Sequence, residues 1–236
     1  MQIGTFRKNV MKTVAVKGSK LGIRTVSRNT NKTNIAHAIV WLKGHVGSLL
    51  QVLTPYVLGA QMSAEHKADA LVVMGDIAYD LTVLCRVLKV KMPSATKKSK
   101  LTGTRTAGLM ELDSLATDLL QVMERGTFQS PKLKTIKKVV VLPNKGGAKE
   151  ERDVEVVDVE AEAKADLARQ DTMRSLLTSF VALFWRLTYD TLQAPPVVVI
   201  DAKFARMVKD FPDVTFDTSE PKTVEKEAET AVAGLG

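Results

Sequence analysis

The sequence predicts a mainly α-helical bundle with one β-hairpin inserted into it. In several long stretches, apolar residues recur every three or four positions, which is the spacing of one buried helix face. Glycines and prolines stand where these stretches end. Residues 132–159 differ, because β-branched residues flank a glycine turn there. A chain of 236 residues, 45% of them hydrophobic, can bury one sizeable core, so we expect one main domain.

Start and stop signals bound the predicted helices. Ser63 has the side chain of an N-cap, and Gly126 can end a helix because glycine accepts the backbone conformation found there. A proline also follows four of the periodic stretches and cannot continue a helix. These prolines are Pro55, Pro93, Pro195 and Pro212. The predicted helices span about 34–54, 63–91, 109–125, 161–192 and 198–210.

The remaining segments complete the predicted organisation. Residues 134–142 are basic and residues 153–160 are acidic, and we expect them to pair as the two strands of the hairpin. Residues 1–32 contain three glycines and little apolar periodicity, so they are expected to be flexible. The chain is thereby divided into a basic flexible arm at 1–32, a helical domain at 33–92 and 161–217, an insertion at 93–160 and a flexible tail at 218–236.

Charge is divided unevenly along the chain. Residues 1–149 hold 24 Lys and Arg against 8 Asp and Glu, whereas residues 150–236 hold 10 against 18. Blocks of positive charge attract polyanions by releasing counterions, so nucleic-acid phosphates are an expected partner. The residues expected to bind them are Arg7, Lys8, Lys12, Lys17, Lys20, Arg24, Arg28, Lys97, Lys98 and Lys100. The alternative is that the basic arm folds back on the acidic half of the same chain or keeps the chain soluble.

Several single features bear on location and packing. Cys85 is the only cysteine and lies in an apolar helical run, which is typical of a core residue in a reducing compartment. The most apolar run, at 176–185, is too short to cross a bilayer, so we expect a cytoplasmic, intracellular protein without a membrane partner. Side chains predicted to be buried, at least in part, are His37, Trp41, Phe180, Phe184 and Trp185.

Two segments carry a resemblance to a known family. Residues 37–53 include Gly44-His-Val-Gly-Ser, and residues 68–88 include Val73-Met-Gly-Asp-Ile-Ala-Tyr-Asp. In their glycines and apolar positions they resemble the two metal-site helices of the MazG-like, all-α nucleoside triphosphate pyrophosphohydrolases. That family places two glutamates three residues apart on the first helix, and a glutamate and an aspartate three apart on the second. The resemblance implies an all-α fold and a homodimer.

The acids of that family are largely replaced in this chain. His45 and Ser48 stand at the two glutamate positions of the first helix, Val73 stands at the glutamate position of the second, and Asp76 keeps the aspartate. Carboxylates at i and i+3 share a helix face and can hold Mg²⁺ against a triphosphate. With one acid of four, family-type Mg²⁺ binding is expected to be weak or absent.

A third segment matches the closing part of the family. Residues 200–212 place Lys203 at an asparagine position and Arg206 at a lysine position of the family's nucleotide site, and Lys209 precedes the final turn. The resemblance implies that these three cations bind nucleotide. The matched segments cover residues 34–92 and 170–215.

A relocated metal site is the alternative to a lost one. Glu65, Asp69, Asp76 and Asp80 are four, seven and four residues apart and so form a stripe on one helix. Asp69, Asp76 and Asp80 can be ligands of Mg²⁺, with His45 or His66 nearby, and Asp76 is then the catalytic residue. The competing interpretation is a solvated or ion-paired face opposite Arg86 or Lys43.

Three functions are consistent with these patterns. The first is a catalytically degenerate MazG-like protein, a pseudoenzyme, that binds nucleotide or nucleic acid through its basic half. The second is an active Mg²⁺-dependent nucleoside triphosphate pyrophosphohydrolase with a rearranged metal site. The third is a structural or assembly protein with a basic arm.

Overall fold

The computed structural model describes residues 1–20, 28–92, 103–127, 138–139, 153–154, 159–193 and 195–218. Its helices are α1 (Ile3–Lys20), α2 (Arg28–Val57), α3 (Ala64–Val87), α4 (Arg105–Thr127), α5 (Val159–Leu192) and α6 (Val197–Asp210). Between α4 and α5 lie the short strands β1 (Lys138–Val139) and β2 (Asp153–Val154). The predicted mainly α-helical fold class is confirmed. No helix of the described residues has both the length and the apolar composition of a membrane span.

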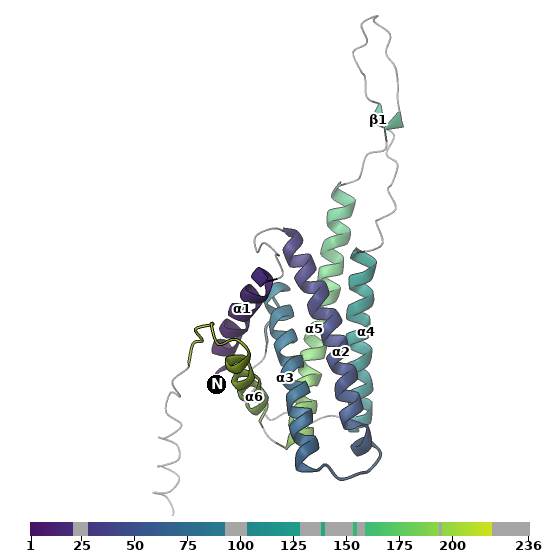
Figure 1. Cartoon of the computed structure of the whole chain (residues 1–236). Coiled ribbons are helices and arrows are strands. Elements are labelled where there is room, and N and C mark those ends of the chain that lie inside the picture. The colour runs from purple at the N-terminus through teal and green to yellow at the C-terminus, as the bar shows by residue number, and fades with distance from the viewer. Residues whose placement is uncertain are drawn as a thin grey trace, which may run out of the picture.

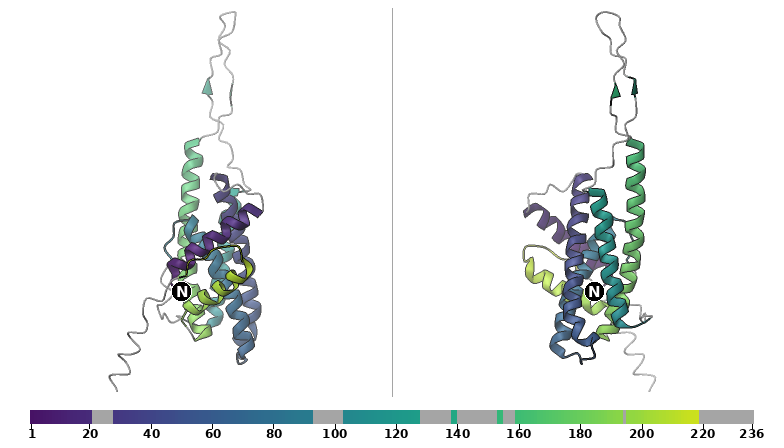
Figure 2. Two further views of the ribbon diagram at one scale, coloured as in Figure 1. Left: turned by 60° about the vertical axis from the view of Figure 1, so that its left-hand side comes forward. Right: turned by 90° about the vertical axis from the view of Figure 1, so that its right-hand side faces the viewer.

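Four long helices, α2 to α5, form a bundle, and two helices cover one side of it (Figure 1). Within the bundle α2 packs on α3 and α4, and α4 packs on α5. Helices α1 and α6 contact each other and both lie against α3, as Figure 2 shows from two further sides. Because α3 contacts α1, α2, α5 and α6, it is the central element, and it is largely buried from Met74 to Cys85.

The bundle core comes from the helix faces that the apolar spacing predicts. Phe180, Phe184 and Trp185 of α5 are buried, as predicted. Trp41 is a correction, because 58% of its surface is exposed and its ring lies T-shaped to the His45 ring with 6.2 Å between the ring centres. His37 is also exposed, not partly buried. The two residues are four positions apart and lie on one side of α2.

The first 20 residues are not a flexible arm, which corrects that prediction. Residues 3–20 form α1, which packs on α3 and α6. Phe6 and Val10 are fully buried, and the buried Asn9 exchanges two hydrogen bonds of 2.8 Å with the backbone of Asp217. Among residues 3–14, whose side chains the structure describes, Phe6 and Val10 are the large buried side chains and the other buried positions are polar, so the apolar periodicity is weak in the sequence. Residues 28–32 belong to α2, and residues 21–27 lie outside the described residues.

The segment predicted as an insertion contributes a helix to the bundle. In α4, Leu112 and Leu119 are fully buried between α2 and α5, so this helix belongs to the same core and not to a separate insertion. The strands β1 and β2 pair antiparallel, with Lys138 opposite Val154 and Val139 opposite Asp153. Val159 and Glu160, predicted to end the second strand, begin α5 instead. The other residues of the predicted hairpin, and the tail at 219–236, lie outside the described residues.

The N-cap of α3 gives the first testable prediction. The Ser63 Oγ accepts a hydrogen bond of 3.2 Å from the backbone N–H of His66, as the predicted cap requires. We expect Ser63→Ala to lower the free energy of unfolding by about 1 kcal/mol, since one N–H at the helix start loses its partner. Urea denaturation measures this loss. In the control Ser48→Ala, the lost hydroxyl only donates to the Gly44 carbonyl within α2, and an equal loss there would contradict the cap assignment.

Candidate functional site

The predicted site residues of α3 and α6 meet in the structure. The Asp76 Oδ1 accepts a hydrogen bond of 2.5 Å from the Lys203 Nζ and one of 3.0 Å from the Arg206 Nη2. Only 22% of the Asp76 side chain and 14% of the Lys203 side chain are exposed. Arg206 makes a second hydrogen bond to α3, because the same Nη2 donates to the Val72 carbonyl at 2.8 Å. Both cations therefore form hydrogen bonds with groups of α3.

Gly75 allows α6 to lie this close to α3. A Cβ at this position would stand 3.1 Å from both the Lys203 Cβ and the Arg206 Nη2. A larger side chain would push α6 outward and lengthen both ion pairs. The close packing of α6 on α3 therefore explains the glycine before Asp76 without a bound ligand.

A second polar pair lies one helical turn further along α3. The Asp80 Oδ2 is 2.7 Å from the His45 Nδ1 of α2, and the Asp80 side chain is buried, whereas His45 is partly exposed. Since Asp76 and Asp80 are four residues apart, they share one side of α3. We call Asp76, Asp80, His45, Lys203 and Arg206 the charged cluster.

Tyr79 extends the polar contacts toward α1 and was not predicted from the sequence. Its hydroxyl is 3.0 Å from the Thr13 Oγ1, and the Thr13 hydroxyl also hydrogen-bonds the Val10 carbonyl. The Lys203 Nζ lies 5.1 Å from the centre of the Tyr79 ring, a distance at which a cation is attracted to the ring face. Burial raises the pKa of Tyr79 to about 12, so the hydroxyl keeps its proton at neutral pH.

The two carboxyl groups of the cluster are shifted in opposite directions. Burial acts to raise the pKa of Asp76, but the hydrogen bond and the charge of Lys203, with the charge of Arg206, hold that pKa below its ordinary value. Burial raises the pKa of Asp80, and the hydrogen bond and charge of His45 do not overcome this effect. Asp76 is thus a carboxylate neutralised by two cations, whereas Asp80 is a buried acid stabilised by one imidazole.

The pKa of Asp76 gives a pH-dependent prediction. Because the folded-state pKa is lowered, the ionised carboxylate stabilises the fold above the unfolded-state value of 3.8, and this contribution is lost as pH falls below it. We expect Asp76→Asn to be less stable than the wild type at pH 7 and pH 5 by about 1–3 kcal/mol. The difference should shrink at pH 3. Urea denaturation at the three pH values measures it, and a difference that grows toward acid pH would contradict the assignment.

The predicted relocated metal ligands do not gather at one point. Asp76 and Asp80 belong to the charged cluster, whereas Asp69 and His66 are exposed. The His66 Nδ1 is occupied by the Ser63 hydroxyl at 2.6 Å, and Lys43 pairs with Asp113 of α4 and not with the acids of α3. Among the described residues, no group of three or more His, Cys, Asp or Glu side chains is arranged to hold a metal ion.

The predicted phosphate-binding residues have different surroundings. Lys209 is exposed and lies outside the charged cluster. Lys12 pairs with Asp217 at 2.8 Å, so part of the basic N-terminal segment does fold back on the acidic half of the chain. Lys8 is exposed, and Arg7 is partly buried near Cys85. The side chains of the others, Lys17, Lys20, Arg24, Arg28, Lys97, Lys98 and Lys100, lie outside the described residues.

A basic surface lies at the C-terminal end of α3, where a stretch of the sequence without acids begins. Arg86, Lys89 and Lys91 are exposed there, and no acid of the described residues pairs with them. Arg7 of α1 is close enough to Cys85 for its charge to act on the thiol, whose pKa burial nevertheless raises to about 12. We call Arg7, Arg86, Lys89 and Lys91 the basic end of α3. The sequence indicates this surface by the lysine and arginine residues that precede and follow Pro93.

The fold and the charged cluster together define a mainly α-helical protein in which the carboxylate of Asp76 is neutralised by the chain's own cations. Comparison with protein-family models, with curated proteins and with solved structures gave no match. The assignment of a function therefore depends on the residues of this chain.

Proposed function

We propose that the chain is a MazG-like helical protein that has lost the family's magnesium chemistry and binds nucleotide or nucleic-acid phosphates through its basic half. The observation that carries this proposal is the pair of hydrogen bonds from Lys203 and Arg206 to Asp76, at 2.5 and 3.0 Å. Asp76 stands where the resemblance keeps its one metal-binding acid, and two side-chain cations occupy that carboxylate. The proposed fold includes a β-hairpin insertion, of which the structure describes the short antiparallel pair β1 and β2.

The charges of the cluster favour loss of metal binding. Mg²⁺ gives up water reluctantly and requires carboxylates that carry surplus negative charge. The cluster holds two carboxyl groups, Asp76 and Asp80, against two permanent cations, Lys203 and Arg206, before the charge of His45 is considered. A metal ion there would compete with the ammonium and guanidinium groups for Asp76, at the cost of their ion pairs with this carboxylate. That cost is several kcal/mol for a buried pair.

Phosphate binding is assigned to exposed cations that have no acidic partner in the described part of the chain. The basic end of α3 offers Arg86, Lys89 and Lys91, and the predicted residues Lys97, Lys98 and Lys100 follow in the sequence within a few positions. Exposed lysines and arginines bind phosphates through counterion release, with little dependence on base sequence. The proposed ligand therefore carries several phosphate groups, either as the triphosphate of a nucleotide or as the phosphodiester backbone of a single-stranded nucleic acid.

The salt dependence of oligonucleotide binding tests this proposal. The probe is a fluorescently labelled deoxythymidine strand of about 20 nucleotides, long enough to span several phosphate contacts and titrated at several salt concentrations. We expect the triple variant Arg86→Gln, Lys89→Gln, Lys91→Gln to bind more weakly and to reduce the slope of log K against log salt by about 0.7 for each lost phosphate contact. Deleting residues 1–32 is not a suitable test, since Phe6 and Val10 belong to the core.

Lys164→Gln is the matched control, because Lys164 is an exposed lysine of α5 in the acidic half of the chain. The control should bind like the wild type. An unchanged slope in the triple variant would overturn the assignment to the basic end of α3. Weakening in the control that equals the effect of the triple variant per charge removed would show that binding follows overall net charge only.

The resemblance also implies a homodimer, which we include in the proposal. The support is an exposed apolar pair on α2, Val40 and Trp41, of which about half the surface of each is exposed. Sedimentation equilibrium of the wild type and of Trp41→Glu tests this part: a dimer that becomes a monomer in the variant supports it, and a wild-type monomer contradicts it.

A further inference from the structure

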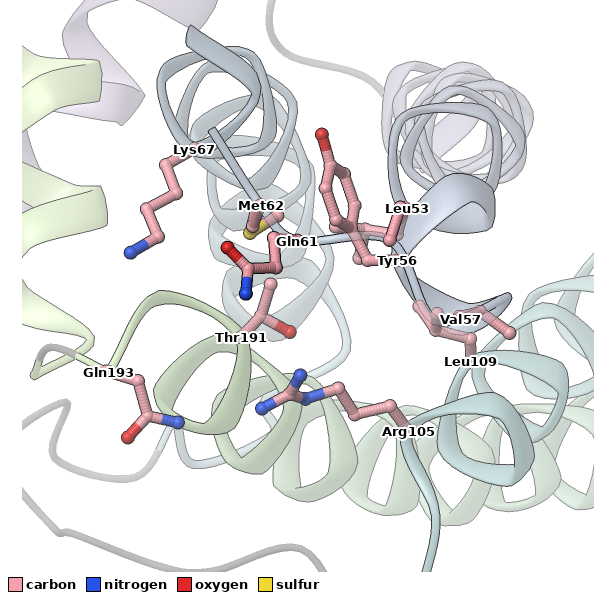
Figure 3. A pocket seen from close by; sticks show the side chains of 11 residues that line it. Leu53, Tyr56, Val57, Gln61, Met62, Lys67, Arg105, Leu109, Thr191 and Gln193 are labelled. Atoms are coloured by element: carbon pink, nitrogen blue, oxygen red, sulfur yellow. The ribbon is translucent and has the colours of Figure 1, made fainter. Parts of the chain in front are cut away.

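A pocket lies at the end of the bundle opposite the basic end of α3. Its volume is about 370 Å³, and it is formed where the connection from α2 to α3 meets the start of α4 and the end of α5 (Figure 3). This volume is at the lower end of the range for pockets that hold small organic molecules. The pocket shares no residue with the charged cluster, so ligand binding in it does not depend on the proposed function.

The walls of the pocket are of two kinds. Apolar side chains cover one part, with Leu53 and Tyr56 from α2, Met62 before α3 and Leu109 from α4. Polar and cationic groups cover the other, and Figure 3 shows Lys67 and Arg105 on two sides of the pocket with Gln61 and Thr191 between them. Among the described lining residues there is no acid. The lining therefore suits a ligand that has an apolar body and a negatively charged end.

The charge expected at the polar end of the ligand follows from the ion-pair partners of Lys67 and Arg105. The Arg105 Nε donates to the Asp190 Oδ2 at 2.5 Å and the Arg105 Nη2 donates to the Asp190 carbonyl at 3.1 Å, so Asp190 compensates this guanidinium. No described residue accepts a hydrogen bond from the Arg105 Nη1, so its hydrogens can donate to a ligand. No acid in the described part of the chain pairs with Lys67. With Lys67, Arg105 and Asp190 counted together, the site carries one net positive charge.

We infer that this pocket binds a small organic carboxylate, a monoanion with an aromatic or aliphatic body. The carboxylate would accept hydrogen bonds from the Lys67 ammonium and the Arg105 Nη1, and the body would lie against Tyr56, Leu53 and Met62. Charge-assisted hydrogen bonds of this kind are stronger than those between neutral groups, so the carboxylate adds affinity to that of the apolar body. A phosphate dianion would bring one more negative charge than the site balances.

Three probes separate the parts of this inference: 4-phenylbutyrate, its uncharged analogue 4-phenylbutan-1-ol, and acetate. Binding is followed by NMR of the side-chain amides of Gln61 and Gln193, with the intact chain. We expect 4-phenylbutyrate to shift these signals and to bind about tenfold more tightly than the alcohol. Acetate should not shift them. Lys67→Met keeps the length of the side chain and should remove the preference for the carboxylate, while Lys91→Met, which replaces an exposed lysine beyond the other end of α3, should keep it.

Each other outcome overturns the inference. Equal binding of the alcohol would mean that the pocket recognises only the apolar body. Shifts with acetate at the same concentration would mean that only the charge is recognised. No shift with 4-phenylbutyrate at millimolar concentration would mean that the pocket takes no such ligand. This inference and the proposed function can be contradicted independently, because Lys67→Met leaves the basic end of α3 unchanged.

Discussion

Replacing Phe184 by alanine is expected to lower the free energy of unfolding by about 3–5 kcal/mol. Phe184 lies on α5, is fully buried, and stacks at a tilt on Trp185 with 4.8 Å between ring centres. Truncation removes the apolar burial of the ring and leaves a cavity that the surrounding helices fill only in part. Chemical denaturation of wild type and variant, followed by circular dichroism, measures the loss.

The control for this prediction lies on the same helix. Leu167 is 59% exposed, so Leu167→Ala should change the free energy of unfolding by no more than about 0.5 kcal/mol. Equal small effects in both variants would show that α5 does not pack in the bundle. A large loss for Leu167→Ala would show that the exposed face of α5 is covered in solution.

Replacing Asp76 by asparagine is expected to tighten binding of inorganic triphosphate by about tenfold, which corresponds to about 1.4 kcal/mol. In the wild type, Lys203 and Arg206 form ion pairs with the Asp76 carboxylate, so an anion of the chain itself already binds both cations. The neutral amide of asparagine holds these cations less strongly, so they become available to an added phosphate chain. Isothermal titration calorimetry at low salt, with chelator present to remove divalent ions, measures the affinity.

Asp69→Asn separates this local effect from a change in net charge. Asp69 is an exposed acid on the same helix, and its replacement changes the charge of the chain by the same amount. We expect it to leave triphosphate affinity nearly unchanged. An equal gain in both variants would assign the effect to net charge. A loss of affinity in Asp76→Asn would mean that Asp76 assists phosphate binding, as a metal ligand would.

The helices of the bundle were predictable because their signals are local. Apolar spacing, the Ser63 cap and most of the prolines are local signals of this kind, and α2 to α6 lie close to the predicted ranges. Two stop signals were wrong, because Pro55 lies inside α2, which continues to Val57, and α4 includes Gly126 and ends at Thr127. Helix α1 was missed, since it buries Asn9 and Thr13 beside Phe6 and Val10, and buried polar residues weaken the periodicity that reveals a helix. These polar groups are satisfied by partners distant in sequence, Asp217 and Tyr79, which no local pattern indicates.

The candidate site was predictable as a set of residues but not as a set of contacts. The resemblance indicated Asp76, Lys203 and Arg206 separately, as a metal ligand and as nucleotide-binding cations. Their direct pairing depends on how closely α6 packs on α3, which Gly75 permits. The pairing of Asp80 with His45 likewise depends on the register of α2 against α3. Contacts between helices are set by tertiary packing, and the spacing within one helix does not contain that information.

We expect Asp76 to bind the side-chain cations of Lys203 and Arg206 in place of a magnesium ion. The most direct test is Mg²⁺-dependent release of pyrophosphate from a panel of ribonucleoside and deoxyribonucleoside triphosphates, with the wild type and Asp76→Ala measured side by side. We expect no Mg²⁺-dependent release by either protein. Release by the wild type that disappears in Asp76→Ala would contradict this expectation, because Asp76 would then bind a metal ion and not only Lys203 and Arg206.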